Sequence, residues 1–407
     1  MRVAFITGYF PVLSETFILD QLTGLIDRGV DVDVFGIKPE CQTKIHSDFH
    51  MYNIKDRLKC PDLKLSSRFD RVIKFPGLFF SNISSNPQLI FQSLNLIKYG
   101  KVAFSLSLFH EVIPFLRKKK YDIIHAHFGP FGNKALMLRD LNAIDGKLIT
   151  SFHGYDLSTY LRSSDDKIYA RLFSEGEMFL PISNYWKNRL INIGCDENKI
   201  CVQHMGIDCN DFEFTNKPLR KNKDIHLVSI ARLTEKKGLE YSIKAVCNIL
   251  KQRQDIFYQI IGDGPLRQEL QTLINTLGCQ NHINLVGWKN RDEVIKILKK
   301  SNLLIAPSVT ASDGDMEGIP MVLMEAMAMG IPVISTFHSG IPELIEDGKT
   351  GFLVPERNTK ALLEKIDYVT QTPESIATVT NNARQFVELH YNVDKQNDKL
   401  LKNYEKL

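Results

Sequence analysis

The sequence has little of what marks membrane-spanning, secreted, zinc-binding or nucleic-acid-binding proteins. It contains no run of about eighteen apolar residues, and its N-terminus leads straight into Pro11. We therefore expect neither a spanning helix nor a signal peptide, and predict a cytoplasmic protein. The seven cysteines are scattered without CxxC pairs, which favours free thiols over a disulfide framework or a zinc site. A net charge of +4 is too weak to predict nucleic acid as a partner.

The chain has the length and the pattern of two α/β domains. Its 407 residues are 43% apolar and 24% charged, as in ordinary globular proteins. Apolar strands alternate with helix-length segments on both sides of the polar, proline-containing stretch 211–224. This pattern predicts two Rossmann-like, doubly wound domains that face each other across a cleft. We place the first domain at 1–210, the linker at 211–224, the second domain at 225–380, and C-terminal helices that return across the junction at 381–407.

Polar residues follow the expected strands of the first half. The strand 2–8 ends at Gly8, and a helix should begin near Ser14, which places Ser14 and Glu15 at its start. A ligand approach at this turn and an ordinary capped turn both fit the residues. Strands at 121–129 and 147–156 bring His127 and His153 to the edge where α/β sheets bind ligands. Without acidic ligands at recognisable spacing, these histidines favour hydrogen-bonding roles over a metal site. A further strand is expected at 199–208.

The stretch 309–330 contains a helix whose side chains are apolar on every face. Pro320 favours the first turn, and Gly330 with Pro332 favours a stop, so the helix should run from Pro320 to Met329. Glu325 is its only charge, and Glu317 lies in the loop before it. A buried carboxylate needs a partner, either a protein cation or the hydroxyls of a ligand. The free N–H groups of the helix N-terminus favour a ligand here.

Other polar groups of the second half also follow strands. Arg232 comes directly after a strand and Lys237 opens the next helix, so both could close on a diphosphate, although solvated surface cations are the common alternative. The turn containing Gly262 and Gly264 offers backbone groups. The strand end with Val286 and Trp288 offers an aromatic ring to a base.

Residues 54–80 are rich in basic and aromatic side chains, and a second basic run occupies 117–120. Such a stretch could rest on an anionic membrane surface with its aromatics in the headgroup layer. It could equally be a solvated helix whose apolar side packs on the domain. The sequence leaves both interpretations open, and with the first the protein would sit peripherally on the inner face of the cytoplasmic membrane.

Five stretches occur in the order found in one enzyme family: ARLTEKKG, GDGP, VGW, the Glu-x7-Glu stretch MEGIPMVLMEAMAMGIPVIST, and SGIPELIEDGKTGFLVP. With them, the chain resembles the retaining family 4 glycosyltransferases of the GT-B fold over almost its whole length. The SETFI text at 14–18 and the stretch around Glu317 are similar to bacterial colanic-acid and other exopolysaccharide enzymes. This resemblance implies transfer of a hexose from a nucleotide diphosphate sugar, expected to be UDP-linked, to a polyprenyl-diphosphate-linked saccharide.

The resemblance also implies roles for individual residues. The expected catalytic residues are His153, Glu317, Arg232 and Lys237. The expected donor-binding residues are Gly8, Arg232, Lys237, Gly262, Gly264, Val286, Trp288, Gly318, Ile319, Pro320, Met321 and Glu325. The expected acceptor-binding residues are Ser14, Glu15 and His127. No metal or other cofactor is expected, because cations and helix termini would stabilise the leaving diphosphate. Two alternatives remain, a nucleotide-sugar 2-epimerase of the same shape and a protein that binds a nucleotide without catalysis.

Overall fold

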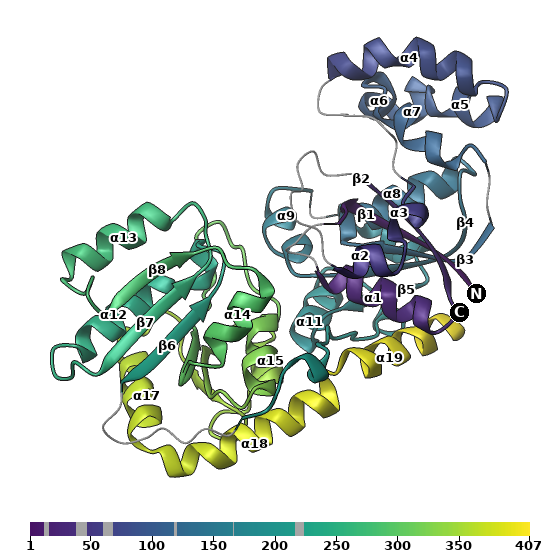
Figure 1. The fold of residues 1–407 in the computed structure, drawn as a ribbon. Coiled ribbons are helices and arrows are strands. Elements are labelled where there is room, and N and C mark those ends of the chain that lie inside the picture. Colours follow the sequence, from purple (N-terminus) through teal and green to yellow (C-terminus); the bar gives the residue numbers. More distant parts are fainter. Residues whose placement is uncertain (12–15, 38–46, 60–67, 118–119, 166, 216–223) are drawn as a thin grey trace.

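The computed structural model describes residues 1–407 except 12–15, 38–46, 60–67, 118–119, 166 and 216–223. Two helix-flanked parallel sheets lie side by side, and the last two helices run along both (Figure 1). This arrangement confirms the predicted fold of two doubly wound domains. No described helix is long and apolar enough to cross a membrane.

The first sheet has the strand order β2-β1-β3-β4-β5, and every pair in it is parallel. Its apolar strands are buried on both faces, as expected for parallel strands covered by helices. Because the strands run in one direction, the ends of β1, β3 and β4 meet at the same edge. The elements are β1 (Arg2–Tyr9), α1 (Thr16–Asp27), β2 (Asp31–Ile37), β3 (Lys120–His127), α8 (Gly129–Asp140), β4 (Asp145–Phe152), η2 (Tyr155–Leu157), α9 (Thr159–Arg162), α10 (Ala170–Glu175), β5 (Met178–Pro181), α11 (Asn184–Asn192), η3 (Glu197–Lys199) and η4 (Cys209–Asp211).

A layer of short helices is inserted between β2 and β3 and forms the far end of the N-terminal domain (Figure 1). Aromatic contacts hold the layer together, such as Phe75 against Phe109 with ring centroids 4.8 Å apart. Its members are α4 (Arg68–Asn82), α5 (Pro87–Ser93), α6 (Leu96–Phe104), α7 (Ser107–Val112) and η1 (Ile113–Phe115). Two further short helices of this segment, α2 (Ser47–Met51) and α3 (Ile54–Arg57), lie against α1 and β2 instead.

The second sheet has the order β11-β10-β9-β6-β7-β8, again all parallel. The predicted apolar helix is present as α15, which begins after Pro320 and ends at the left-handed Gly330 (φ 77°). The elements are β6 (Ile225–Ile230), η5 (Glu235–Lys237), α12 (Leu239–Ile249), β7 (Ile256–Ile261), α13 (Arg267–Thr276), β8 (Ile283–Gly287), α14 (Arg291–Leu298), β9 (Leu303–Ala306), α15 (Met321–Ala328), β10 (Val333–Thr336), α16 (Ile341–Leu344), β11 (Phe352–Val354) and α17 (Thr359–Gln371).

The C-terminal helices join the two domains, as predicted. α18 (Pro373–His390) packs on α15, and α19 (Val393–Glu405) packs on α1. The Arg28 guanidinium, directly after α1, donates to Asp398 over 2.7 Å, and the Tyr404 hydroxyl lies 2.6 Å from His125 Nδ1. The residue boundaries given above for the domains stay predictions, and part of the predicted linker lies outside the described residues.

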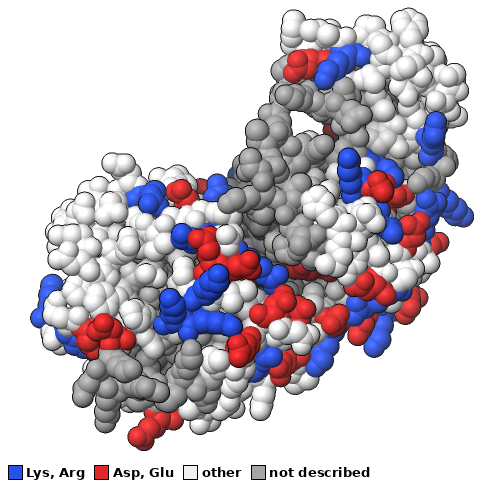
Figure 2. Space-filling view, viewed as in Figure 1, with Lys and Arg blue, Asp and Glu red and all other residues white. Residues whose placement is uncertain are grey.

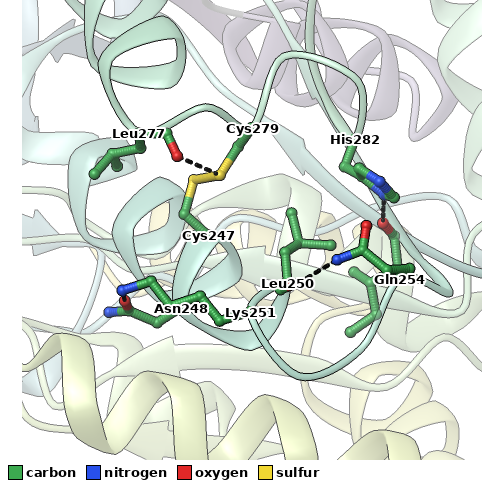
Figure 3. The surroundings of a disulfide bond; sticks show 9 residues. Cys247, Asn248, Leu250, Lys251, Gln254, Leu277, Cys279 and His282 are labelled. Carbon is green, nitrogen blue, oxygen red and sulfur yellow. Dashed lines mark hydrogen bonds between the residues drawn. A yellow bond between two sulfur atoms is a disulfide. The ribbon is translucent and has the colours of Figure 1, made fainter.

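Two expectations from the sequence are wrong. Residues 199–208 form no strand, because only the amide N–H groups of Cys201 and Gln203 bond to the β5 carbonyls (2.9 Å each). Cys247 and Cys279 are joined in a disulfide rather than carrying free thiols (Figure 3). The Cα atoms of the two cysteines are 5.9 Å apart because α12 packs against α13, although 32 positions separate the cysteines in the sequence. Cys195, Cys201 and Cys209 are free, as predicted.

Candidate active site

An ion-pair cluster lies at the centre of the second domain's ligand edge. The Glu317 carboxylate is 2.5 Å from Lys237 Nζ and 3.2 Å from Lys236 Nζ. Lys236 Nζ also lies 3.1 Å from Asp315 Oδ2. Burial alone would raise the pKa of Glu317, but the two lysines outweigh it and lower that pKa to about 2. Glu317 is therefore an ionised carboxylate held in a site that excludes most water.

A buried histidine positions the Glu317 backbone. The Glu317 N–H donates to His338 Nε2 over 3.0 Å, so the ring proton lies on Nδ1 and is donated to Glu356 Oε1 over 2.6 Å. The other Glu356 oxygen accepts the Thr310 N–H over 2.8 Å. This chain of contacts ties the loop before α15 to the ends of β9, β10 and β11.

Arg232 lies at the end of β6 with its guanidinium exposed, and no described residue hydrogen-bonds or pairs with it. The neighbouring glycines are needed for close backbone packing. A Cβ at Gly262 (φ 133°) would lie 1.9 Å from the Ala231 oxygen, and one at Gly264 would lie 2.5 Å from the Leu233 oxygen. The predicted glycine turn therefore packs directly against the backbone on both sides of Arg232.

A cavity of about 470 Å³ opens between α1 and the second domain. Glu325 and Met321 of α15 line it together with Trp288, which follows β8. Burial raises the pKa of Glu325, and nearby Arg291 opposes that rise. The Glu325 carboxylate has no hydrogen-bond partner in the part of the chain that the structure describes. A ligand in this cavity would therefore meet an acidic acceptor and an indole ring. The opposite wall includes Thr16, Asp20, Thr23 and Gly24 of α1.

Three histidine rings stack at the facing edge of the first domain. Ring centroids are 4.4 Å apart for His125 and His127, and 5.6 Å apart for His127 and His153. His127 Nδ1 lies 3.4 Å from His153 Nε2. Burial lowers the pKa of His127 to about 3 and, with His127 nearby, lowers that of His153, so both rings are neutral. His127 is fully buried behind His153, and its Nε2 atom has no hydrogen-bond partner among the described residues.

Close contact between the domains brings His153 and the Glu317 loop together. A Cβ at Gly318 would lie 2.3 Å from Ile182 Cδ1 and 3.7 Å from the His153 carbonyl oxygen. The Glu343 carboxylate accepts the N–H groups of Asn184 and Tyr185, over 2.8 Å and 2.9 Å, at the start of α11. Residues from both domains thus meet at one site.

Asp156 fixes the turn that carries His153. Its carboxylate is fully buried and accepts the N–H groups of His153 (3.0 Å), Gly154 (2.9 Å) and Gly129 (2.9 Å). Burial raises its pKa to about 6, while these three N–H groups lower it. Asp156 is thus a positioning residue that joins the end of β4 to the start of α8.

We expect Asp156→Asn to lower the free energy of unfolding. The amide has one acceptor oxygen where the carboxylate has two, so at least one buried N–H group would lose its partner, at a cost of about 1–3 kcal/mol. Urea unfolding measures this effect. Asp122→Asn, a change at an exposed carboxylate that accepts the Arg2 N–H, is the matched control. Unchanged values for Asp156→Asn would contradict the role given to this carboxylate.

The remaining predicted residues divide into three groups. Ser14 and Glu15 lie outside the described residues. Gly8 lies near the end of β1, at the edge of the first sheet where a ligand is expected. A Cβ atom at this position would lie 3.0 Å from the Phe131 ring. Val286 lies in β8, and Ile319 and Pro320 lie directly before α15.

Sequence reasoning missed Lys236, His338, Glu356 and Asp156. His338, Glu356 and Asp156 lie within about four residues of the ends of β10, β11 and β4, and Lys236 precedes the predicted Lys237, so these positions were the signal that could have found them. Among the described residues, no three His, Cys, Asp or Glu side chains form a group that could hold a metal ion. The expectation that the reaction needs no metal stays a prediction.

Family models match both halves of the chain. Residues 14–211 match the model described as Glycosyltransferase Family 4, and residues 210–386 match Glycosyl transferases group 1. The amylovoran biosynthesis glycosyltransferase AmsK of Erwinia amylovora is 40% identical, with 96% of each chain covered. The putative colanic acid biosynthesis glycosyltransferase WcaL of Escherichia coli K12 is 38% identical, with the same coverage.

More distant similarities concern a lipid-linked substrate and the fold. An Escherichia coli enzyme named UDP-Gal:alpha-D-GlcNAc-diphosphoundecaprenol alpha-1,3-galactosyltransferase is 25% identical, covering 76% of this chain and 80% of its own. The crystal structure of Anabaena Alr3699/HepE in complex with UDP superposes with a TM-score of 0.72 at 17% identity, covering all of both chains. The second similarity supports the two-domain fold.

Proposed function

The chain belongs to the family 4 glycosyltransferases, and from that premise we propose that it acts in exopolysaccharide synthesis as a retaining enzyme. The donor would be a UDP-hexose and the acceptor a polyprenyl-diphosphate-linked saccharide. The names of AmsK, WcaL and the diphosphoundecaprenol galactosyltransferase support this assignment. The observation that carries it is the buried, ionised Glu317 between two lysines, with His153 of the other domain beside its loop.

The charges of the site suit departure of a diphosphate. Breaking the bond to the anomeric carbon places negative charge on the leaving oxygen and positive charge on the sugar ring. Arg232 and Lys237 would stabilise the first charge, and the Glu317 carboxylate would ease the second. Retention would follow from attack on the face that the diphosphate leaves, so we assign no protein nucleophile. His153 would contact the sugar near the reacting carbon, and the Glu325 carboxylate would bind the ribose hydroxyls.

Ligand-induced thermal shifts test the donor assignment directly. UDP, GDP, ADP and their common sugars would be added to purified protein, each with and without EDTA. A ligand at about 100 times its dissociation constant stabilises by roughly 2.7 kcal/mol, which raises the melting temperature by several degrees. We expect UDP compounds to give this shift regardless of EDTA. A shift with GDP compounds alone would overturn the UDP assignment, and loss of the shift with EDTA would overturn metal independence. Release of a 2-epimerised sugar nucleotide without acceptor would indicate an epimerase.

We expect Glu325→Gln to weaken binding of UDP and UDP-sugars about tenfold. A carboxylate can accept a hydrogen bond from each of two hydroxyls, and hydrogen bonds to a charged group are stronger than those to a neutral one. An amide is neutral, and its NH₂ group is a donor where one of the carboxylate oxygens was an acceptor. Isothermal titration with UDP measures the change. Inorganic diphosphate, which has no ribose, is the control ligand and should bind both proteins equally. A similar loss for diphosphate would contradict a ribose contact.

A further inference from the structure

Helix α4 presents an apolar stripe to solvent. Phe69, Ile73, Pro76 and Phe80 recur at helical spacing and are all exposed, with Phe69 at 73%, Ile73 at 60% and Phe80 at 76%. The residues between them, Phe75 and Phe79, already pack on the helical layer. A helix that covers a domain normally turns polar residues outward, whereas α4 exposes Phe69, Ile73 and Phe80 and has no fully buried residue.

Further exposed aromatic rings extend the stripe at each end. The Arg68 guanidinium at the start of α4 lies 4.4 Å above the ring of Phe104, which ends α6 and is 62% exposed. Near the other end, the ring centroid of Phe79 lies 6.1 Å from that of Phe91 on α5, and Phe91 is 61% exposed. These contacts place the exposed rings of Phe104 on α6 and Phe91 on α5 beside α4. Figure 2 shows few charged side chains on this end of the N-terminal domain.

The helical layer is basic as well as apolar. Residues 68–104 contain five cations, Arg68, Arg71, Lys74, Lys98 and Lys101, against one carboxylate, Asp70. Apolar side chains flanked by long basic ones match a bilayer interface, where rings enter the headgroup region and cations stay at the lipid phosphates. A second copy of the chain would bring like charges together.

We propose that the face formed by α4, with Phe91 and Phe104 at its ends, docks on an anionic lipid bilayer. The docking surface lies at the far end of the N-terminal domain from α19 (Figure 1). Docking would serve to deliver a lipid-linked acceptor to the enzyme, and this purpose rests on the proposed function. The binding itself does not.

Vesicle flotation tests the docking surface. Wild-type protein is expected to float with vesicles that contain phosphatidylglycerol, far less with phosphatidylcholine alone, and less again as salt rises. The variant Phe69→Ser/Ile73→Ser/Phe80→Ser should lose about tenfold or more of this binding. Leu277→Ser/Leu389→Ser removes two exposed leucines of the C-terminal half and should bind like wild type. Equal binding by the triple variant would overturn the proposal.

Further measurements separate this outcome from misfolding, self-association and failure of the proposed function. Circular dichroism and the shift given by UDP should be the same for the triple variant and wild type. Phe80→Trp, a conservative change, should show a blue-shifted emission with anionic vesicles, and an unshifted emission would count against insertion. A wild-type dimer that the triple variant breaks, without vesicle binding, would show a homodimer interface instead. If vesicles bind but no nucleotide does, the proposed function fails and the docking surface stands.

Discussion

Glu317→Gln is expected to abolish most transfer and to destabilise the folded protein at neutral pH. The carboxylate sits between Lys236 and Lys237 and is only 9% exposed. Removing its charge leaves Lys236 paired with Asp315 and leaves Lys237 without an acidic partner among the described residues, and breaking a buried ion pair costs about 3–5 kcal/mol. Loss of the same charge would leave the positive sugar ring without its carboxylate, so transfer should fall about 100-fold or more.

The destabilisation should depend on pH with a defined sign. The two lysines hold the pKa of Glu317 at about 2, against an ordinary value of 4.5. A carboxyl whose folded-state pKa is lowered stabilises above its unfolded pKa, and this contribution is lost as pH falls from about 4.5 through 2. The difference corresponds to about 3 kcal/mol at about 1.4 kcal/mol per pKa unit.

Urea unfolding of wild type and Glu317→Gln between pH 7 and pH 3 measures this difference. The two unfolding free energies should differ most at pH 7 and converge toward acid pH. Glu346→Gln is the matched control, because Glu346 is an exposed carboxylate paired with Lys349 on the surface. Parallel pH profiles for wild type and Glu317→Gln would refute the strong pairing of this carboxylate.

Local signals in the sequence were sufficient for the elements that carry the site. Pro320 and Gly330 bounded α15 because both act through their own backbone angles. The Ser183 hydroxyl caps α11 by accepting the Trp186 N–H over 3.3 Å, a role that serine commonly has at a helix start. Runs of apolar residues located the parallel strands, whose ends then indicated the ligand edge. Each of these features depends on neighbours within a few positions in the chain.

Features that depend on distant residues could not be predicted. The sequence assigned Lys237 to a phosphate and Glu317 to a sugar, but not the ion pair between them, which joins residues 80 positions apart. The disulfide of Cys247 and Cys279 likewise required the packing of α12 on α13. The contacts of His338 with Glu317 and Glu356 also join separate segments, and its position after β10 could not show them. Tertiary packing decides such pairings, and a single sequence contains no local sign of them.

Arg232→Ala is expected to reduce transfer about 100-fold or more while leaving the fold unchanged. Arg232 is exposed and, among the described residues, has no side-chain partner. Its removal should therefore change the free energy of unfolding by no more than about 0.5 kcal/mol. A fixed guanidinium beside the leaving diphosphate would stabilise charge that develops in the transition state, so the loss should appear mainly in kcat.

Lys237→Ala gives the contrasting result, because this cation pairs with the buried Glu317 in the protein without ligand. That variant should lose both transfer and stability, whereas Arg232→Ala should lose transfer alone. Arg232→Lys should recover part of kcat relative to Arg232→Ala, because the lysine ammonium restores the positive charge but not the bidentate geometry of the guanidinium. Lys360→Ala, at an exposed lysine of the same domain, is the control and should match wild type. Wild-type kcat in Arg232→Ala would exclude a role for this guanidinium in diphosphate departure, and the cluster of Lys236, Lys237 and Glu317 would then have to provide that stabilisation alone.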